Sequence, residues 1–450
     1  MPIAEFLKKI PIFDYSVHCV GIGGIGVSAL AELLFEGGFR VSGSDAEIND
    51  ICRELAQKGI KIAPEGHRAG NVPQSGCGAV IMTAATNFNN PEVVELLRMR
   101  AMAWSRGEFL GELCRCYQRP VMVAGSHGKS STAAMLGWML RKLDVDTGLL
   151  IGAKYNSPDE RNARLGNGDL LIAEADESDG THALLSGELA LITNIDGDHA
   201  WSAEAVAEQE DNFRRFTADF KKTFYIASEN SCRVLANCRN AEALSKEKFE
   251  YLSSLAPLEM LGYERSNAAL ALAGMEYLGY DAVKAAEALK SYPGIKRRQM
   301  VTAVSGDGKI TVLEDYAHHP QELACSLEVM KMRYPEHKLM VVFQPHRYRR
   351  LKHYFNDFVR ILSDKDLSVK VLPVFCAWEP PLIDGMESAD LVMAINAARG
   401  RAELLDMTDL IYCADLLCRE AADETAPVLV ALIGAGTIDR LAKVLADRIG

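Results

Sequence analysis

Long apolar runs, a secretory leader pattern and sequence repeats are all missing from this chain. None of its apolar stretches reaches the roughly 18 residues that a membrane-spanning helix needs. The amino terminus, MPIAEFLKKI, lacks the layout of a signal peptide. We therefore expect a cytoplasmic protein that does not associate with a membrane.

Organised cysteine is missing as well. The 11 cysteines are scattered, odd in number and include no C-x-x-C pair. Cys114 and Cys116 are the only close pair, as C-x-C, and we interpret them as packing residues rather than as a metal clip. This usage is typical of a reducing compartment, where structural disulfides are rare.

Positive charge is in deficit, with 49 lysines and arginines against 61 acidic residues and a net charge of −12. This balance argues against nucleic acid as the main partner. Small anionic ligands are not excluded, because exposed charges more than roughly 8 Å away are screened at physiological salt. At 450 residues, 48% apolar and 24% charged, the chain predicts a globular protein of two or three domains.

The most informative motif that is present is a glycine-bracketed turn after the apolar run PVMVAG. The turn reads Gly125-x-x-Gly128-Lys129-Ser130, two residues shorter than the common G-x-x-x-x-G-K-[ST] form, and an amphipathic helix follows it. Such a turn lets backbone N–H groups surround a polyphosphate, while the lysine meets the terminal phosphates and the hydroxyl reaches Mg²⁺. The motif predicts a nucleotide-binding loop.

A second glycine motif precedes it, between a predicted strand and a predicted helix. Gly21, Gly23, Gly24 and Gly26 fit G-x-G-x-x-G, and Asp45 ends the next predicted strand near the offset of a ribose-binding acid. One interpretation is a pyrophosphate seated on the helix N-terminus, and the other is tight strand–helix packing with no ligand. The motif alone suggests NAD. The phosphate loop downstream makes NAD less attractive, since UDP carries a pyrophosphate too.

The order of apolar and polar segments predicts an α/β protein with three domains. Two Rossmann-like domains, over 1–111 and 298–450, flank a central P-loop domain with a parallel sheet over 112–297. Residues 201–290 are helix-rich, and the segment SYPGIKRRQM (291–300) is typical of a domain joint.

Candidate metal ligands follow two predicted strands of the central domain. Glu174 ends the strand DLLIAEA, and His199 follows the strand LALITNI, so both lie at the sheet edge where α/β folds bind ligands. Mg²⁺ prefers oxygen, so Glu174 suits it better than His199 does. For the neighbouring acids a solvated turn position is the simpler interpretation: Asp176, Glu177, Asp179 and Asp198.

Histidines and arginines gather in the last third of the chain. Arg297 and Arg298 lie at the joint, and DYAHHP (315–320) and QPHRYRR (344–350) each follow a strand. Because arginine binds carboxylate and phosphate bidentately, these segments predict a pocket for such groups. A zinc site at His318-His319 is disfavoured by the lack of further ligands nearby, and Arg349 is the member best explained as a surface charge.

Together these motifs resemble the Mur ligases, ATP-dependent amide-forming enzymes of peptidoglycan precursor synthesis. The resemblance runs over nearly the whole chain and rests on GIGGIGVSALAELL with GSD, Gly66-His67, TAA…NNPEV, EADESDG, TNIDGDH, GIKRR, DYAHHPQE, FQPHRY and GAG. EADESD followed by DYAHHPQE and FQPHRYRR is more specific than either glycine motif.

The resemblance implies one ligand for each domain. The first domain would bind the UDP-sugar through Gly21, Gly23, Gly24, Gly26, Ser44, Asp45, His67, Thr83 and Arg106. The second would bind ATP through Gly125, His127, Gly128, Lys129, Ser130, Ser131 and Asn267, with Arg297, Arg298 and Asp315 holding ATP from the far side when the domains close. The third would hold the amino acid through Tyr316, His318, His346, Arg347 and Arg350. Ser130, Glu174 and His199 would hold Mg²⁺, and Lys129, Glu174 and His199 would be the catalytic residues.

The chain departs from the family pattern at the rim of the predicted site. Serines replace threonines in the family's GTHGKTTT loop, which keeps the hydroxyls. Tyr263-Glu264 replaces the His-Asn of the adenine segment and leaves only Asn267, which puts nucleotide affinity in question. Trp201 stands where an acid is usual, and Thr437 where an amide or acid often follows the GAG segment.

The implied reaction joins L-alanine to the lactyl carboxylate of UDP-N-acetylmuramate through an acyl phosphate, with ATP and Mg²⁺, in a monomer or homodimer. His199 or His346 could act as the base for the amine. One alternative is a ligase that attaches a preformed peptide to the same UDP-sugar. Another is a non-catalytic protein that binds the nucleotide or the UDP-sugar, and a dehydrogenase rests on the first glycine motif alone.

Overall fold

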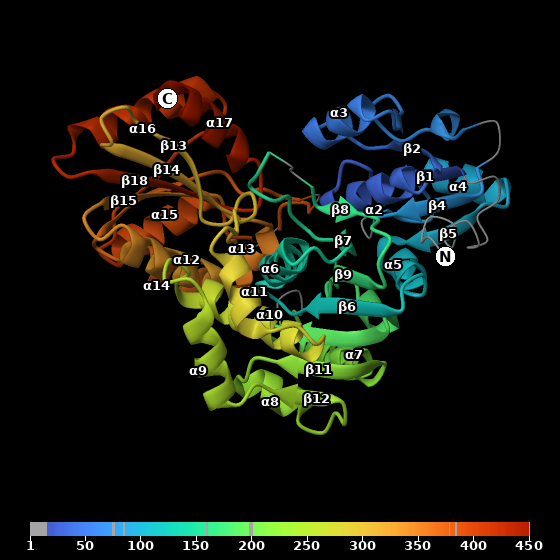
Figure 1. Ribbon diagram of the computed structural model, residues 1–450. Helices are drawn as coiled ribbons and strands as arrows, with labels where there is room; N and C mark the ends of the chain where they lie inside the picture. The colour runs from blue at the N-terminus through green and yellow to red at the C-terminus, as the bar shows by residue number, and fades with distance from the viewer. Residues whose placement is uncertain are drawn as a thin grey trace. The chain divides into compact units, whose positions relative to one another are not determined.

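The computed structural model describes residues 16–73, 77–83, 86–158, 161–197, 201–377, 379–382 and 385–449. The chain forms two compact units, Met1–Pro293 and Gly294–Gly450, and three β-sheets follow one another along it (Figure 1). The predicted α/β class is confirmed. The division between the units falls inside the predicted joint, and the domain boundaries at 111/112 and 297/298 stay predictions. Within the described ranges, no helix is both long enough and apolar enough to cross a membrane.

The first sheet has five parallel strands in the order β3-β2-β1-β4-β5, as the strand–turn–helix alternation predicts. Its central strand β1, SVHCV, is buried along its whole length, including the polar residues Ser16 and His18. The strands are β1 (Ser16–Val20), β2 (Arg40–Ser44), β3 (Lys61–Ile62), β4 (Ala79–Met82) and β5 (Met102–Ser105). The helices are α2 (Ile25–Glu36), α3 (Asp50–Gln57), α4 (Pro91–Arg98) and α5 (Arg106–Cys114), with a 3₁₀ turn, η2, at Ala69–Asn71.

The second sheet has seven strands in the order β12-β11-β10-β6-β9-β7-β8, all parallel to their neighbours except β8. The strands are β6 (Arg119–Ala124), β7 (Thr147–Leu150), β8 (Ala163–Arg164), β9 (Leu170–Glu174), β10 (Gly187–Ile192), β11 (Phe220–Tyr225) and β12 (Ala241–Ala243). The helices are α6 (Lys129–Lys142), α7 (Ala203–Ala218), α8 (Glu229–Leu235), α9 (Lys246–Leu255), α10 (Gly262–Tyr277) and α11 (Ala282–Leu289), with η3 at Thr181–Leu184. A single apolar cluster runs from Val17 in the first sheet to Leu235 beside the second, so the two sheets share one core.

The segment 201–290 is helix-rich, as expected, but it also contains β11 and β12, which the sequence pattern did not reveal. In β11 the lysines Lys221 and Lys222 interrupt the apolar positions, and Lys221 is exposed. β12 has three residues and forms the edge of the sheet, where neither face needs to be apolar. Polar, short edge strands of this kind lack the apolar alternation by which strands are recognised.

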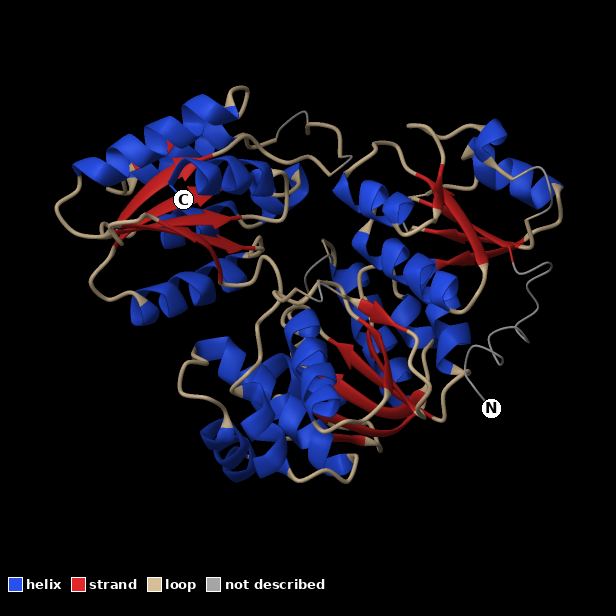
Figure 2. Ribbon diagram, turned by 45° about the horizontal axis from the view of Figure 1, so that its top comes forward, coloured by secondary structure: helices blue, strands red, loops and turns tan. Residues whose placement is uncertain are grey.

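The third sheet forms the second unit, in the order β13-β14-β18-β15-β16-β17, with β13 antiparallel to β14 and the other pairs parallel. The strands are β13 (Met300–Val304), β14 (Ile310–Asp315), β15 (Lys338–Phe343), β16 (Leu367–Val371), β17 (Ala402–Leu404) and β18 (Val428–Ile433). The helices are α12 (Pro320–Arg333), α13 (Tyr348–His353), α14 (Phe355–Leu362), α15 (Ser388–Ala397), α16 (Leu410–Asp423) and α17 (Ile438–Ile449). Figure 2 shows helices on both faces of this sheet, as in a doubly wound fold.

Phe109 of α5 offers a test of the shared core. Its side chain is fully buried and meets Trp104 edge to face at 5.5 Å between ring centroids. We expect Phe109→Ala to lower the free energy of unfolding by about 3–5 kcal/mol, because the truncation leaves a cavity. Urea denaturation followed by circular dichroism measures the change. Leu97→Ala, at an exposed position of α4, is the control, and an equal loss in both variants would contradict the assignment of the core.

Candidate active site

The turn between β6 and α6 has the geometry of a phosphate loop. Gly125 and Gly128 have φ angles of +129° and +81°, which side-chain-bearing residues rarely adopt. A Cβ on Gly125 would lie 2.2 Å from Thr193 Oγ1, and one on Gly128 would lie 2.6 Å from Asn267 Oδ1. Gly128 precedes the first residue of α6, so the loop presents the N-terminus of a helix of 14 residues. The predicted strand–loop–helix is confirmed, and both glycines are needed for it.

Lys129 carries a positive charge at the start of α6, on a side chain that is 14% exposed. Its Nζ donates to Gly125 O at 2.7 Å and pairs with Glu177 Oε2 at 2.8 Å. Burial alone would lower the pKa of Lys129, but the charges of Glu177, Glu174 and Asp176 outweigh it and raise the pKa above its ordinary value. The lysine is therefore held protonated in the loop.

Glu177 pairs with Lys129, and for this residue the expectation from the sequence was wrong. A solvated turn position was the simpler expectation, but the residue is 4% exposed and its carboxylate faces Lys129. Burial raises the pKa of Glu177, and the charge of Lys129 opposes that shift. The expectation failed because EADESDG folds back on the phosphate loop, a tertiary contact that no local pattern reveals.

Glu174, at the end of β9, meets Ser130 as expected for two residues around one metal. Its Oε2 accepts the Ser130 hydroxyl at 2.6 Å and the Gly152 N–H at 2.8 Å. These oxygens suit Mg²⁺ in kind. Within the described residues no group of three or more His, Cys, Asp or Glu side chains is close enough to hold a metal by itself. His199 and Asp198 lie outside the described residues.

Asn267 of α10 lies under the phosphate loop. It is 4% exposed, and its Oδ1 faces Gly128. Within the described part of the chain its buried Nδ2 has no hydrogen-bond partner, which is costly unless a ligand accepts from it. Nearby, Glu264 accepts the Leu261 N–H at 3.5 Å and so helps to begin α10. This orphaned donor and the two glycines fit a nucleotide.

His127, another predicted loop residue, is held by the segment after β10. The N–H of His127 donates to Asn194 Oδ1 at 2.9 Å, and its carbonyl accepts from Thr193 Oγ1 at 2.5 Å. Ser131 is 8% exposed in the first turn of α6. The end of β10 therefore fixes the shape of the phosphate loop.

Arg106 joins the two glycine-rich loops. Its guanidinium pairs with Asp176 at 2.8 Å, and its Cδ lies 2.7 Å from where a Cβ of Gly26 would be. Burial would raise the pKa of Asp176, but the charges of Arg106 and Lys129 outweigh it and hold the pKa well below its ordinary value. Arg106, which was expected to bind the UDP-sugar, is thus engaged with the acidic segment beside Lys129.

The first glycine loop is tight and partly filled by its own side chains. Gly21 has a φ of +80°, and a Cβ there would lie 2.5 Å from Thr83 Cγ2. The N–H of Gly23 donates to Asp45 Oδ2 at 2.8 Å. Gly24 precedes the first residue of α2. Asp45 therefore holds the loop itself in this structure.

Ser44 and His67 belong to a buried polar network around Glu92, which sequence reasoning missed. Glu92 is the second residue of α4 and is fully buried. Its Oε2 accepts the Ser44 hydroxyl and lies 3.3 Å from His18 Nε2, while Ser44 Oγ lies 3.0 Å from His67 Nδ1. Its Oε1 accepts from Asn71 Nδ2 at 2.6 Å. The one available signal was the acid directly after Asn-Pro at a helix start.

Burial would raise the pKa of Glu92, but hydrogen bonds from His18, Ser44, Asn71 and the Arg68 N–H lower it to about 2. The carboxylate is therefore charged at neutral pH although no water reaches it. Because Glu92 lies in the first turn of α4, its negative charge also interacts favourably with the helix dipole.

The second unit gathers its predicted residues at the carboxyl ends of β14 and β15. The guanidinium groups of Arg297 and Arg298 lie over the Tyr316 ring, at 5.0 and 5.2 Å. The His318 ring lies 5.4 Å from Tyr316 and 5.3 Å from His346, by ring centroids. The sequence therefore located one continuous cluster of aromatic and basic groups.

Buried partners orient this cluster. Arg350 is 1% exposed, and its guanidinium lies 2.9 Å from His346 Nδ1, which must accept because arginine only donates. Phe375 stacks on the His346 ring at 5.5 Å. Arg347 has a φ of +67°, a strained value for a residue with a side chain. Asp315 is 2% exposed, accepts from Gln299 and Ala317, and so supports the backbone of the cluster.

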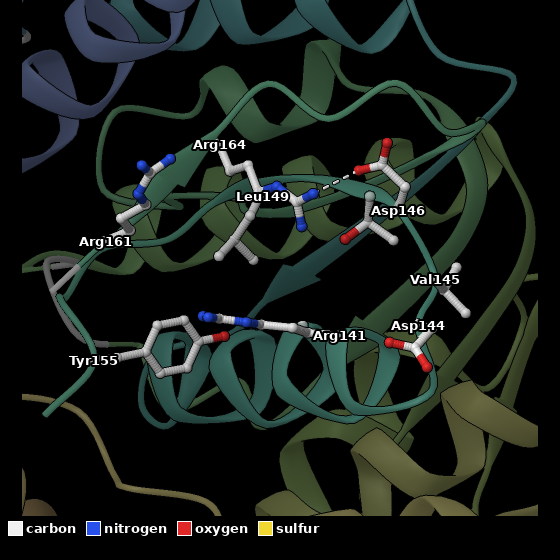
Figure 3. A pocket seen from close by; sticks show the side chains of 10 residues that line it. Arg141, Asp144, Val145, Asp146, Leu149, Tyr155, Arg161 and Arg164 are labelled. Carbon is white, nitrogen blue, oxygen red and sulfur yellow. Dashed lines mark hydrogen bonds and ion pairs between the residues drawn. The ribbon is translucent and has the colours of Figure 1, made fainter. Parts of the chain in front are cut away.

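A separate cavity of about 430 Å³ lies beside the second half of α6, near β7 and β8 (Figure 3). Arg164 pairs there with Asp146 at 2.8 Å, drawn as a dashed line, and Arg161 pairs with Glu36 at 3.0 Å. None of the predicted site residues lines it. Arg161 and Arg164 are thus engaged by acids, and no residue of the phosphate loop lines this cavity.

Known proteins match both the sequence and the fold. A family described as "Mur ligase family, catalytic domain" matches residues 16–118. A UDP-N-acetylmuramate–L-alanine ligase of Desulforapulum autotrophicum is 34% identical, covering 96% of this chain and 98% of the relative. One of Methylococcus capsulatus is 33% identical, covering 100% and 98%. The chain belongs to the Mur ligase family.

Solved Mur ligase structures share the fold. The UDP-N-acetylmuramate–alanine ligase of Thermotoga maritima superposes with a TM-score of 0.78 at 23% identity, covering 96% of this chain and 98% of that one. A murein peptide ligase of Psychrobacter arcticus gives 0.68 at 21% identity, covering 97% and 98%. The three-sheet architecture is therefore that of a Mur ligase.

Gly128→Ala tests the phosphate loop. We expect it to abolish the thermal stabilisation by ATP, the nucleotide that Mur ligases use, because the new Cβ would meet Asn267 and strain the backbone. Gly38→Ala is the matched control, since Gly38 has a φ of +84° but nothing within 4 Å of its Cβ. Gly38→Ala should lower the melting temperature slightly and keep the ATP response. A full ATP response in Gly128→Ala would contradict the loop assignment.

Glu92→Gln tests the buried charge. The pKa falls from 4.5 to about 2 on folding, so we expect the variant to be about 3 kcal/mol less stable at pH 7. Because the folded pKa is the lower one, this contribution is complete above about pH 4.5 and is lost as the pH falls through about 2. Urea titrations at decreasing pH should show the two stabilities converging. A difference that stays constant with pH would count against a charged Glu92.

Proposed function

We propose that this chain is an ATP-dependent UDP-N-acetylmuramate–L-alanine ligase of peptidoglycan precursor synthesis. The observation that carries the proposal is identity of 34% along 96% of the chain to a ligase of that name. The phosphate loop, the Glu174–Ser130 pair and the basic cluster of the second unit are the parts that such a reaction requires. Use of ATP and a UDP-sugar implies a cytoplasmic location.

In this proposal the phosphate loop holds ATP. Lys129 exchanges Glu177 and the loop carbonyls for the terminal phosphates, to which an ammonium group is a strong donor. The N-terminus of α6 adds its dipole, and Asn267 Nδ2 finds its missing acceptor on the nucleotide. His127 and Ser131 complete the loop, and Arg297 and Arg298 stay predicted ATP ligands that the family pattern implies.

Ser130 and Glu174 would hold Mg²⁺, with His199 as the further ligand that the family pattern implies. The metal would supply positive charge to the phosphoryl group under transfer. Ser130 donates to Glu174 at 2.6 Å, so the two oxygens lie close enough to share one ion. The remaining ligands would be phosphate oxygens and water, as is usual for Mg²⁺.

The first sheet would hold the UDP-sugar at the carboxyl ends of β1, β2 and β4. The glycine loop from Gly21 to Gly26 would face the pyrophosphate, and Ser44, Asp45, His67 and Thr83 would face the rest of the nucleotide. Arg106 would reach the sugar only by releasing Asp176, or would act through that pair. The second unit would bind L-alanine by the carboxylate through Arg347, beside Tyr316, His318 and His346, while the buried Arg350 would support the His346 ring.

The chemistry follows from the unreactive carboxylate. Transfer of the γ-phosphoryl group to the lactyl carboxylate makes an acyl phosphate, whose leaving group is phosphate. The amine of alanine attacks, the oxyanion collapses, and phosphate departs. Lys129 and the arginines stabilise charge on the transferring group and on the oxyanion. Because His346 Nδ1 already accepts from Arg350, His346 is poorly placed to act as the base for the amine.

An assay matrix tests the function. UDP-N-acetylmuramate with ATP should release phosphate on addition of L-alanine, and no release with alanine, serine or glycine would refute the proposal. Turnover with a tripeptide but not with alanine would identify a peptide ligase instead. Tight UDP-sugar binding with no ADP formed would identify a non-catalytic protein. Stabilisation by NADH but not by the UDP-sugar would point to a dehydrogenase.

Lys129→Ala tests the mechanism. We expect phosphate release to fall by at least about a thousandfold, because the fixed charge on the phosphoryl group is lost, while UDP-sugar binding stays unchanged. Lys142→Ala is the matched control, since Lys142 ends the same helix on its exposed side. Activity that persists in Lys129→Ala would show that the loop does not hold the reacting phosphates.

A further inference from the structure

The Glu92 carboxylate has more hydrogen-bond partners than a structural ion pair requires. This network joins two strands of the first sheet, β1 and β2, to the helix α4 (Figure 1) through a single buried carboxylate. Its members Ser44 and His67 are residues through which the UDP-sugar would be bound. Glu92 itself has no exposed surface and cannot touch a ligand directly.

Counting protons assigns a direction to the hydrogen bonds. A carboxylate only accepts, so the Ser44 hydroxyl donates to Glu92. Ser44 has one proton, so its oxygen must accept from His67 Nδ1, 3.0 Å away, and Glu92 Oε2 itself lies 3.5 Å from the same nitrogen. His67 therefore carries a proton on Nδ1, and in the neutral ring the free lone pair is on Nε2. The charge of Glu92 thus selects the tautomer of His67.

The loop that carries His67 is held by the same carboxylate. Glu92 Oε1 accepts the Arg68 N–H at 3.1 Å and Asn71 Nδ2 at 2.6 Å, and Asn71 Nδ2 also donates to Gly66 O at 2.8 Å. The residues on both sides of His67 are thereby fixed. The His67 ring is 24% exposed, and among the described residues its Nε2 has no protein partner.

Resting on the proposed function, we infer that Glu92 is a positioning residue for the UDP-sugar, acting through Ser44 to make His67 Nε2 a hydrogen-bond acceptor. The matching group on the ligand is a donor of the UDP moiety, either the uracil N3–H or a ribose hydroxyl. An amide keeps only one acceptor oxygen, so Glu92→Gln puts a donor either toward Ser44 and His18 or toward Asn71 and the Arg68 N–H. In the first case Ser44 loses its acceptor. The hydroxyl can then turn toward His67 and reverse its tautomer.

Calorimetric binding without turnover tests the inference. For Glu92→Gln and Ser44→Ala we expect the Kd of UDP-N-acetylmuramate to rise about 10- to 100-fold, the effect of losing a hydrogen bond to a charged or buried group. The Kd of ATP should stay unchanged, because Lys129 and Asn267 lie on helices α6 and α10, beside the second sheet. Glu95→Gln is the matched control, since Glu95 lies on the same helix and pairs with Arg98 at the surface. Glu92→Asp should recover part of the affinity.

A readout besides affinity separates positioning from mere stability. Nitrogen-15 spectra of histidine-labelled protein should show His67 protonated on Nδ1 in the wild type and in Glu95→Gln, and a shift toward Nε2–H in Glu92→Gln. In the wild type, 3-methyl-UDP or 2′- or 3′-deoxy-UDP should bind more weakly than UDP, and the analogue whose penalty disappears in Glu92→Gln identifies the donor.

The inference fails if Glu92→Gln only lowers the melting temperature and binds the UDP-sugar as the wild type does. It fails also if Ser44→Ala keeps full affinity, if the tautomer does not change, or if the affinities for ATP and UDP-sugar fall together. A wild-type chain that binds neither UDP nor UDP-N-acetylmuramate would overturn the proposed function along with it. A wild type that binds both, with a Glu92→Gln variant of equal affinity, would overturn this inference alone.

Discussion

The positive charge of Lys129 is largely shielded from solvent, and the arrangement of the phosphate-loop region follows from the need to compensate it. A lone buried ammonium group would lose its proton, so carboxylates must lie around it. Glu177 supplies the direct contact at 2.8 Å, and Glu174 and Asp176 supply further negative charge. Asp176 in turn needs Arg106, which brings the start of α5 against the acidic segment. One cation at a loop thereby fixes a chain of alternating charges between two sheets.

The first sheet has to compensate a buried negative charge instead, and it does so with hydrogen-bond donors. There the buried charge is the carboxylate of Glu92, and the Ser44 hydroxyl, the Asn71 amide, the Arg68 N–H and the His18 ring surround it. No lysine or arginine side chain is among these partners, whereas the Lys129 loop presents an ammonium group. An anionic ligand therefore gains more at the Lys129 loop, and the Glu92 network is better suited to orienting polar groups than to binding phosphate. This difference is consistent with a nucleotide phosphate chain at one sheet and directional recognition at the other.

The sequence predicted those parts of the molecule whose signal is local. Strand–glycine–helix patterns located both loops, and apolar runs located β1, β6, β9 and β18 because these strands are buried on both faces. The segments from Asp315 and from Gln344 were correctly expected to meet, because parallel strands place their carboxyl ends at one edge. What could not be predicted is pairing over long distances. The contact of Glu177 with Lys129 and the network of Glu92 with Ser44 depend on how separate turns fold together, and nothing in either segment marks its partner.

The departures from the family pattern can be understood on the same physical grounds. Glu264 accepts a backbone N–H at the start of α10, so the acid that replaces an amide there serves the helix. A well-begun helix keeps Asn267 fixed under Gly128, one and a half turns further on, and its unpaired Nδ2 is still offered to a ligand. Thr437 likewise accepts from Gln344 Nε2 at 3.2 Å and holds the segment before His346. In both places the departing residue makes a supporting hydrogen bond, to the start of α10 or to the segment before His346. The third departure, Trp201, has no such structural explanation.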